Sequence, residues 1–536
     1  MELNSEQKRF TFWLGITFLI WWAGIGPSDL YALPMLIVFV EVSIWVIKDR
    51  FFTNLKSLSQ QLTLLISRPS YSRILIIFLG LQGLLWFLVV ILRFYSFQLW
   101  TWDAGIHSNI LYNISNGEFY SSYLSVNNLG DHFTPSFNLL AVLYKITPSI
   151  HWMMGAKVIA FVITPVIFYF ILLFELKDKK QAQFWAFILG FGWLILYSPN
   201  VNAVRYEFQA SSLSPPFIAA SFLMLRQKRW FWFSVFSLLL LGFKEHMGAV
   251  FIGFGVSGLL KKESPILSAS LVLIGIGSIY LIMFQAMPYF RNYQASWSGL
   301  ERIDPFIEIP QKFYYLLKLL LPLGFVPLIF WRNGIMAGPA VGINLISRTS
   351  EMYTAHYHYD DVSSALLFLA LIISIKEWKG KGFPLAFPQT KVTQIVLLFS
   401  FILFVSFLPR SAPRYLKDAW PSQRDFQLDA ELKSLNKKYP SAYFVVQDVL
   451  GPHLHRRNIS VLAQYKDHDG ITQASCAEDL FWHGSPIIAD FIVISEHVSD
   501  YQIDDYASCL QQLNESPIFT PVEGYQHLNL FKKVYK

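Results

Sequence analysis

Charged residues are scarce in this sequence of 536 residues: Asp, Glu, Lys and Arg make up 15% of it, against about 25% in ordinary soluble proteins. A soluble fold of this size needs a charged exterior, and 36 acidic and 43 basic residues are too few to supply one. Hydrophobic residues account for 54% of the chain, and its mean hydropathy is +0.40. This balance excludes a soluble globular protein and predicts a chain that crosses a membrane many times.

Cysteine and the familiar soluble motifs are also nearly absent. The two cysteines, Cys476 and Cys509, either form one disulfide in an extracytoplasmic region or remain two thiols, and the sequence favours neither. There is no phosphate-binding loop, no Gly-rich dinucleotide turn and no Cys/His zinc spacing. The net charge of +7 comes from short basic clusters between apolar runs, which is typical of membrane topology signals. We therefore expect no nucleic-acid partner.

Long apolar runs are what the sequence has instead. A span needs about 20 apolar residues, and runs of that order, bounded by charges or by Pro and Gly, predict about thirteen transmembrane helices. They lie near residues 10–26, 31–47, 74–97, 152–174, 183–198, 212–226, 230–243, 247–260, 265–287, 313–331, 335–347, 361–376 and 391–408.

The positions of Lys and Arg predict how these helices are oriented. Basic residues concentrate in alternate loops, which are retained on the cytoplasmic side. Residues 98–135 contain no Lys or Arg and are therefore expected outside. We expect a bacterial plasma (inner) membrane protein with a cytoplasmic N-terminus and an extracytoplasmic C-terminal region.

Three regions follow from this pattern. Residues 1–73 are expected to form a two-helix hairpin and a basic cytoplasmic loop, and residues 74–408 a transmembrane domain with a large outer loop over 98–135. Residues 409–536 mix a charged helical stretch, Asp429 to Lys438, with short β-like runs over 442–446 and 491–494. They are expected to form a small α/β domain.

Ionisable residues at the outer ends of spans are the first candidates for function, because charge is costly in hydrocarbon. Asp103 follows the third run, directly after Trp100 and Trp102, which suit the membrane interface, where it would meet a lipid-borne substrate. The alternative is that Asp103 caps a helix starting at Ala104. Asp131 and His132 offer a carboxylate and an imidazole to a divalent metal or a phosphate, or else simply form a turn.

Further candidates lie in later outer loops. Arg205 is suited to grip a phosphate and Glu207 to ligate a metal, unless the two pair with each other. Lys244 and Glu245 lie between two short apolar runs and must face a polar interior, where a structural ion pair between them is the alternative to a role in function. His356 and His358 alternate with Tyr residues, which suits metal ligation or an interfacial Tyr belt.

The order of these landmarks resembles a large family of bacterial polytopic membrane proteins known by a domain-of-unknown-function label. The resemblance covers roughly residues 74 to 500 and is similar in layout to the GT-C superfamily, integral membrane glycosyltransferases that use polyprenyl-phosphate sugars. The matching segments are Asp103-Ala104-Gly105-Ile106, Asp131-His132-Phe133-Thr134-Pro135, Tyr206-Glu207-Phe208, Lys244-Glu245, His356-Tyr357 and Gly451-Pro452-His453-Leu454-His455-Arg456-Arg457. Asn109 and Gln209 depart from the expected Gln and His, and the second departure puts in doubt any metal role that needs a His there.

The resemblance implies a GT-C-like fold and a glycosyltransferase that moves a sugar from a polyprenyl-phosphate lipid to an extracytoplasmic acceptor. Asp103 would then be the catalytic base. Lys244, Arg205, His356 and Glu245 would hold the donor phosphate, and Asp131, His132 and Glu207 a divalent metal such as Mg²⁺ or Mn²⁺. Two other classes stay open: a transporter or flippase of envelope lipids, which usually shows related halves that this sequence lacks, and a non-catalytic membrane scaffold.

Overall fold

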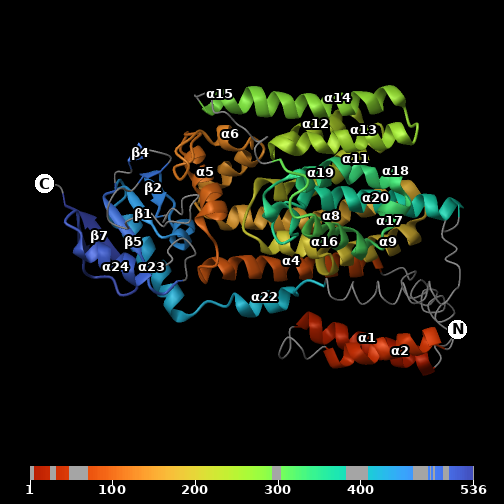
Figure 1. Cartoon of the computed structure of the whole chain (residues 1–536), viewed down its shortest axis with the longest axis horizontal. Coiled ribbons are helices and arrows are strands. Elements are labelled where there is room, and N and C mark those ends of the chain that lie inside the picture. The colour runs from red at the N-terminus through yellow and green to blue at the C-terminus, as the bar shows by residue number, and fades with distance from the viewer. Residues whose placement is uncertain are drawn as a thin grey trace.

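The computed structural model describes residues 5–23, 32–47, 71–291, 303–381, 408–462, 481–482, 485–486, 489–498 and 506–534. Most of them form helices, and a small sheet lies near the C-terminus (Figure 1). Cys476 lies outside the described residues, and so does the predicted apolar run over 391–408 except for its last residue.

The first half of the helical part alternates long helices with single turns. Its elements are α1 (Ser5–Ala23), α2 (Ala32–Ile47), α4 (Tyr71–Tyr95), the π-helical turn η1 (Thr101–Gly105), α5 (Ile106–Ser115), α6 (Asn128–Asp131), η2 (Phe137–Leu140), α7 (Ala141–Ile146), α8 (His151–Leu176), α9 (Lys179–Phe191), η3 (Gly192–Leu196) and α10 (Ser198–Arg205).

The second half continues in the same manner and then enters the C-terminal domain. Its helices are η4 (Ala210–Leu213), α11 (Ser214–Arg226), α12 (Trp230–Leu241), η5 (Glu245–Met247), α13 (Gly248–Leu260), α14 (Pro265–Leu281), η6 (Ile282–Ala286), α15 (Met287–Arg291), α16 (Ile309–Leu320), η8 (Leu321–Leu323), α17 (Val326–Ile329), α18 (Trp331–Gly334), η9 (Ile335–Ala337), α19 (Gly338–Ile346), η10 (Ser350–Tyr353), α20 (Asp361–Lys381) and α22 (Ala412–Asp418).

The described part of the chain does not confirm the predicted number of thirteen membrane spans. By length and composition, three helices of the described part can cross a membrane: residues 74–95, His151–Leu176 and Pro265–Arg291. A fourth span results if Lys179–Leu196 and Ser198–Arg205, which meet at 57°, are taken as one broken helix. The predicted number is therefore not confirmed, although the membrane-spanning character is.

The run predicted over 313–331 does not form one regular span. It is apolar except for Lys318, but it breaks into α16, η8 and α17. Pro322 has no backbone N–H to continue the helical ladder, and Gly324 and Phe325 both have positive φ angles, 61° and 54°. Hydropathy records the apolar character and misses this break.

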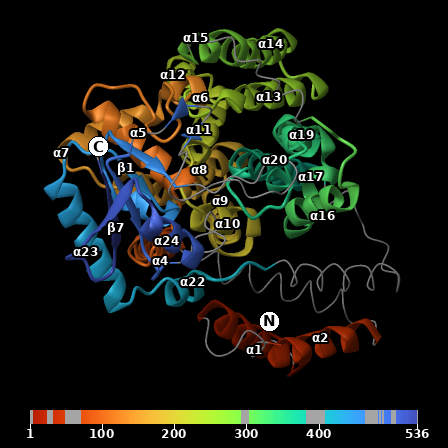
Figure 2. The same ribbon diagram turned by 60° about the vertical axis from the view of Figure 1, so that its left-hand side comes forward.

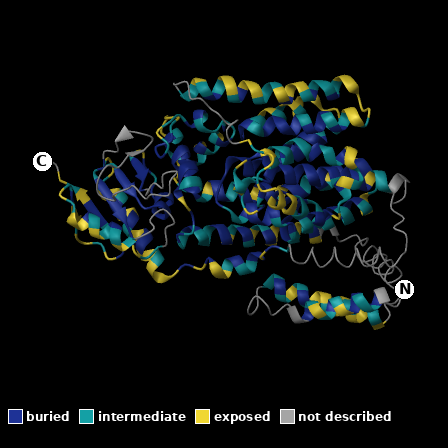
Figure 3. Ribbon diagram, viewed as in Figure 1, coloured by how far each residue is buried: buried dark blue, intermediate teal, exposed yellow. Residues whose placement is uncertain are grey.

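Exposed apolar side chains form the lipid-facing surface of the helical part. α14 lies at its edge in both views (Figures 1 and 2), and its outward positions are exposed (Figure 3). Leu273 is 69% exposed, whereas Phe161 of α8, in the middle of the bundle, is fully buried. Such a contrast is expected where lipid replaces water as the solvent.

Basic side chains meet at one end of the bundle. Glu175 of α8 accepts hydrogen bonds from Arg226 at 2.7 Å and from Lys376 at 2.5 Å, and Lys261 pairs with Glu377. These cations belong to the set that the charge pattern predicts to be cytoplasmic. The opposite end, where α4 ends and α8 begins, is called the site face below.

The C-terminal domain stands at the site face (Figure 1). Its five-stranded sheet has the order β2-β1-β5-β7-β6, with β1 parallel to β2 and β5, and β7 antiparallel to β5 and β6. The predicted charged helix and β runs are confirmed. The elements are α23 (Gln423–Lys438), β1 (Phe444–Val446), η11 (Asp448–His453), β2 (Ile459–Val461), β3 (Phe481–Trp482), β4 (Ser485–Pro486), β5 (Phe491–Ile494), α24 (Tyr506–Glu515), β6 (Phe519–Val522) and β7 (Asn529–Lys533).

Alternating side chains explain how this sheet is covered on both faces. Phe444 and Val446 of β1 share a buried cluster with Leu432 of α23, while Val445 shares another with Leu513 of α24. Successive side chains of a strand point to opposite faces, so each helix covers one face. Cys509 of α24 is disulfide-bonded, and Cys476 is the other cysteine of the sequence.

Candidate active site

Asp103 lies in the π-helical turn η1, which runs directly into α5. Neither Trp100, at the start of the turn, nor Gly105, at the start of α5, makes a side-chain cap. The Asp103 carboxylate instead accepts hydrogen bonds from the Tyr206 hydroxyl and the Gln209 amide. The capping alternative is therefore wrong, and the carboxylate is positioned by the loop that follows α10.

Glu207 fixes the same loop to the turn from the other side. It is 2% exposed, and its two carboxylate oxygens accept the backbone N–H groups of Trp100 at 2.7 Å and Ala104 at 3.2 Å. These residues flank Asp103 on either side. Glu207 is thus occupied with backbone donors and makes no ion pair with Arg205 in the described part of the chain.

Two cations from the long helices hold the backbone of this loop. Lys157 of α8 is fully buried and donates to the carbonyl of Glu207 at 2.5 Å and to that of Tyr206. Arg93 of α4 donates to the Arg205 carbonyl and, at 2.7 Å, to that of Gln98. Charged donors make the stronger hydrogen bonds of proteins, so the Asp103 partners rest on a rigid support.

The buried setting changes the protonation of both carboxyl groups. Burial raises the pKa of Asp103, and the hydrogen bonds from Tyr206 and Gln209 oppose this rise only in part. Burial and the nearby Asp103 charge also raise the pKa of Glu207 well above its usual value. Two carboxyl groups in one desolvated place do not both ionise cheaply. A raised pKa suits a carboxyl group that exchanges a proton during a reaction.

His107, one turn after Asp103, has a positioning role. Its Nδ1–H donates to the Asp103 carbonyl at 2.7 Å, and its ring lies against Phe137 and Phe208. Burial lowers the pKa of His107 to about 3, so the imidazole is neutral at physiological pH. It fixes the turn and carries no charge.

A cluster of His132, Lys244 and Glu245 lies near Asp103. His132 Nδ1 lies 3.2 Å from the Glu245 carboxylate, and the Lys244 ammonium lies 6.0 Å from the centre of the Tyr359 ring. Burial disfavours the charge on His132, but Glu245 outweighs burial and raises its pKa. Lys244 and His132 both act on Asp103 electrostatically. The expected alternative, an ion pair between Lys244 and Glu245, is replaced by the pair of Glu245 with His132.

His358 completes this group. It is 4% exposed, and neither of its ring nitrogens has a hydrogen-bond partner. Its ring lies 5.5 Å from that of Tyr206 and 4.2 Å from that of Tyr359. A buried imidazole without partners costs free energy, which makes His358 a candidate to bind a polar ligand.

Arg205 and His356 lie at the margin of the site. The Arg205 guanidinium lies 5.1 Å from the ring centre of Tyr415, and His356 is exposed. Burial, together with the charges of Lys318 and Arg205, lowers the pKa of His356. These groups form a cationic margin, whereas the residue of the predicted pair that enters the site is His358.

The three predicted metal ligands are not brought together. In the described part of the chain, no three or more His, Cys, Asp or Glu side chains are arranged to hold a metal ion. Both Glu207 oxygens accept backbone N–H groups, His132 pairs with Glu245, and Asp131 is half-buried at the end of α6. This geometry does not fit a three-ligand site of Asp131, His132 and Glu207, and Mg²⁺ or Mn²⁺ dependence stays a prediction.

Sequence reasoning missed Tyr206, Gln209, Lys157 and the role of His358. The sequence carried a signal for two of these residues, Tyr206 and Gln209. Tyr206 belongs to one of the segments that carry the family resemblance, and Gln209 stood out as a departure from the expected pattern. The structure shows that this departure provides the amide that holds Asp103.

These features define a polytopic membrane protein with a buried acidic centre and surrounding cations at one membrane face. Its fold is similar to that of ArnT from Cupriavidus metallidurans, in a crystal structure with undecaprenyl phosphate bound: the TM-score is 0.52 at 12% identity, over 87% of this chain and 99% of that one. The similarity to a GT-C-type fold is therefore confirmed.

The family follows from the sequence. Residues 93–474 match the family described as "Predicted membrane protein (DUF2079)". This match covers more than half of the chain, and the chain belongs to that family. A search of curated proteins finds no match.

Glu207 provides a first test of how the turn is held. Glu207→Gln leaves one oxygen to accept two N–H groups and turns an amide donor toward a backbone donor. We expect it to destabilise the protein by about 1–3 kcal/mol, seen as a lower unfolding midpoint of the purified protein in detergent. Glu118→Gln, which alters an exposed ion pair with Arg457, is the matched control. Equal midpoints for the two variants would contradict the role of Glu207.

Proposed function

We propose that the protein transfers a sugar from a polyprenyl-phosphate donor to an acceptor at the site face, with Asp103 as the catalytic base. The observation that carries this proposal is the carboxylate of Asp103, which is half-buried, bound by Tyr206 and Gln209, and faced by Lys244 and His132. The fold similarity to ArnT, crystallised with undecaprenyl phosphate, supports a polyprenyl lipid as the donor. The predicted orientation places this chemistry outside the plasma membrane.

In the proposed reaction, the acceptor displaces polyprenyl phosphate from the sugar C1. The Asp103 carboxylate accepts the proton of an acceptor hydroxyl or amide, and the freed electron pair attacks the sugar C1. The bond from C1 to the phosphate oxygen breaks, and its electrons leave with polyprenyl phosphate. Lys244, protonated His132 and the cationic margin of Arg205 are the groups that stabilise this negative charge. Neutral His358 offers a ring nitrogen to the sugar or to the phosphate.

The proposal is tested with purified protein in lipid and a panel of polyprenyl-phosphate sugars. Mass spectrometry follows the loss of donor and the release of polyprenyl phosphate, with an envelope extract as the acceptor source. Parallel reactions with Mg²⁺, with Mn²⁺ and with a chelator test the metal. We expect one donor to be consumed. Folded protein that consumes no donor but flips lipids in vesicles would support a transporter instead, and protein that does neither would support a scaffold.

The pH dependence of the reaction tests the protonation state of Asp103. The base acts as a carboxylate, so kcat/KM rises with pH and levels off above the raised pKa of Asp103. Gln209→Leu removes a hydrogen bond that favours the charged form. We expect it to shift this rise to higher pH by about one unit.

The control for this shift is Gln511→Leu, which alters an exposed amide of α24. Its profile should match that of the unmodified protein. A Gln209→Leu profile that moves to lower pH, or does not move, would show that the limb belongs to another group.

A further inference from the structure

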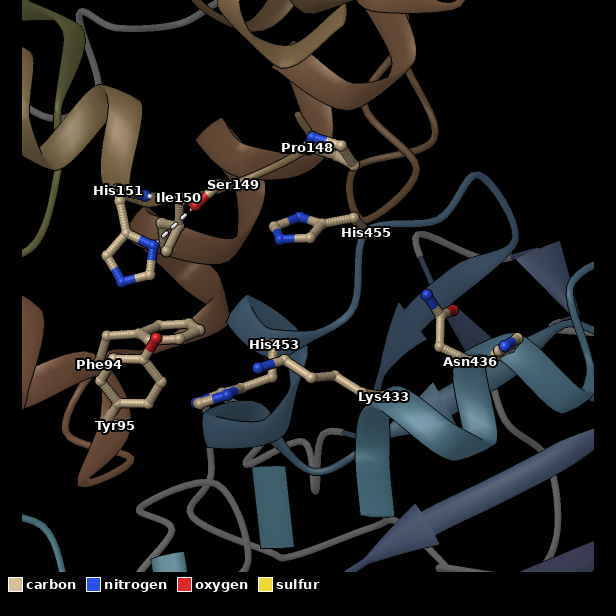
Figure 4. Close-up of a pocket in the computed structure, with 11 residues that line it drawn as sticks. Phe94, Tyr95, Pro148, Ser149, Ile150, His151, Lys433, Asn436, His453 and His455 are labelled. Carbon is tan, nitrogen blue, oxygen red and sulfur yellow. Dashed lines mark hydrogen bonds between the residues drawn. The ribbon is translucent and has the colours of Figure 1, made fainter. Parts of the chain in front are cut away.

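A cavity of about 420 Å³ lies between the C-terminal domain and the helical part at the site face (Figure 4). Its walls come from the end of α4, from the loop that enters α8, from α23 and from the segment after η11. Asp103, Tyr206 and Gln209 do not line it. The cavity is therefore distinct from the candidate active site.

The lining of the cavity is rich in hydrogen-bond donors. Lys433, Asn436 and Lys437 are three and four residues apart and therefore share one face of α23. Among the described residues that line the cavity there is no Asp or Glu. The Asp429 carboxylate, next to the cavity, accepts from Lys433 at 2.6 Å and contacts His453 at 2.9 Å. Two lysines and one engaged carboxylate leave an excess of positive charge.

Three imidazoles also line the cavity, and each is anchored through Nδ1. His151 contacts Ser149 at 2.7 Å (Figure 4). His455 contacts Ser108 at 3.2 Å, and the ring of His453 is bound by Asp429. Among the described residues, neither His151 nor His455 has a hydrogen-bond partner at the second ring nitrogen, Nε2, which can therefore serve a ligand. These rings are held in place before any ligand arrives, which lowers the entropic cost of binding.

The start of α8 adds a further positive contribution. Residues 148–151 line the cavity, and α8 continues from there for 26 residues with no side-chain cap at Ile150. Ser149 accepts the N–H groups of His151 and Trp152, so the helix contributes through the partial positive charge of its N-terminus, which favours anions. The lysines, the anchored imidazoles and the helix thus converge on one volume.

We propose that this cavity binds the phosphate group of a ligand at the membrane surface. A phosphate matches the lining because it is an anion with several acceptor oxygens and the lining offers several donors. The cavity lies where the candidate span over 74–95 ends and that over 151–176 begins, which is where lipid headgroups are expected. The phosphate belongs either to an anionic lipid or to a soluble phosphate ester. This inference is independent of the proposed sugar transfer.

Binding to the full-length protein in nanodiscs tests the proposal and separates the two sources. In one arm, discs of phosphatidylcholine alone are compared with discs that also contain phosphatidylglycerol, and native mass spectrometry counts the retained anionic lipid. In the other arm, glycerol 3-phosphate is titrated into phosphatidylcholine discs by calorimetry. Hydrogen exchange over 148–155 and 433–437 locates the ligand. We expect slower exchange in both segments in at least one arm.

The variant Lys433→Gln/Lys437→Gln removes the two cations at exposed positions, where the fold tolerates the change. We expect its affinity to fall on the order of tenfold. Lys438→Gln is the matched control, because Lys438 lies in the same turn of α23 and does not line the cavity. Equal losses for both variants would mean a general surface charge effect, and exchange that slows in neither arm would mean that no phosphate binds; either result overturns the proposal.

Discussion

Asp103→Asn is expected to lower the rate of sugar transfer by a factor of about 10²–10⁴ while leaving donor binding and folding intact. The amide has the shape of the carboxylate and retains an oxygen for one of the two donors, Tyr206 and Gln209, but it accepts no proton from an incoming acceptor. The measurement is the release of polyprenyl phosphate, beside the donor affinity and the unfolding midpoint of the same preparation.

The control for this change is Asp418→Asn, since Asp418 is 53% exposed and pairs only at the surface with Arg410. It should transfer sugar at the normal rate. Turnover by Asp103→Asn at that same rate would remove Asp103 from the mechanism. A variant that fails to bind the donor would instead give Asp103 a role in recognition, and the two outcomes are separated by the affinity measurement.

The sequence predicted the class of fold because composition and hydropathy act over long stretches. Apolar runs mark helices in lipid regardless of detail, and the short β-like runs over 442–446 and 491–494 contain strands β1 and β5 of the sheet. The predicted number of regular spans is not confirmed in the described part of the chain. Pro322 and Gly324 interrupt a run whose hydropathy alone would continue it, and local backbone geometry decides where such a run turns.

The candidate site was predictable only in part, for a related reason. Asp103 stood out because a carboxylate at the membrane interface is costly without a purpose. Its partners Tyr206 and Gln209 lie more than one hundred residues away, and only the packing of α4 against α8 and α10 brings them to it. The choice between His356 and His358 shows the limit again. The segment is irregular, so no periodicity tells which ring is buried and which is exposed.

The C-terminal domain reaches the turn that carries Asp103, and this contact links the two parts of the chain in function. Thr101, the first residue of η1, donates its N–H to the Asp448 carboxylate at 2.9 Å and its hydroxyl to the Asp448 carbonyl. Gly451 of η11 packs against the same Thr101. The Gly-Pro-His segment noted in the sequence is therefore placed behind the acidic centre and does not enter it.

Gly451→Ala is expected to slow sugar transfer by about 10²-fold and to destabilise the protein by about 1–3 kcal/mol. A Cβ atom at this position would overlap the Thr101 hydroxyl and lie 2.7 Å from that of Tyr123, so η1 must shift and carry Asp103 with it.

The transfer rate and the unfolding midpoint of the Gly451→Ala protein are measured together. Gly342→Ala, where a Cβ meets nothing within 4 Å, is the matched control and should change neither. Thr101→Ala combined with Gly451→Ala removes the overlapping hydroxyl and should recover part of the lost rate, because the turn can then return toward its place. A Gly451→Ala protein that transfers sugar normally would show that the C-terminal domain does not position Asp103.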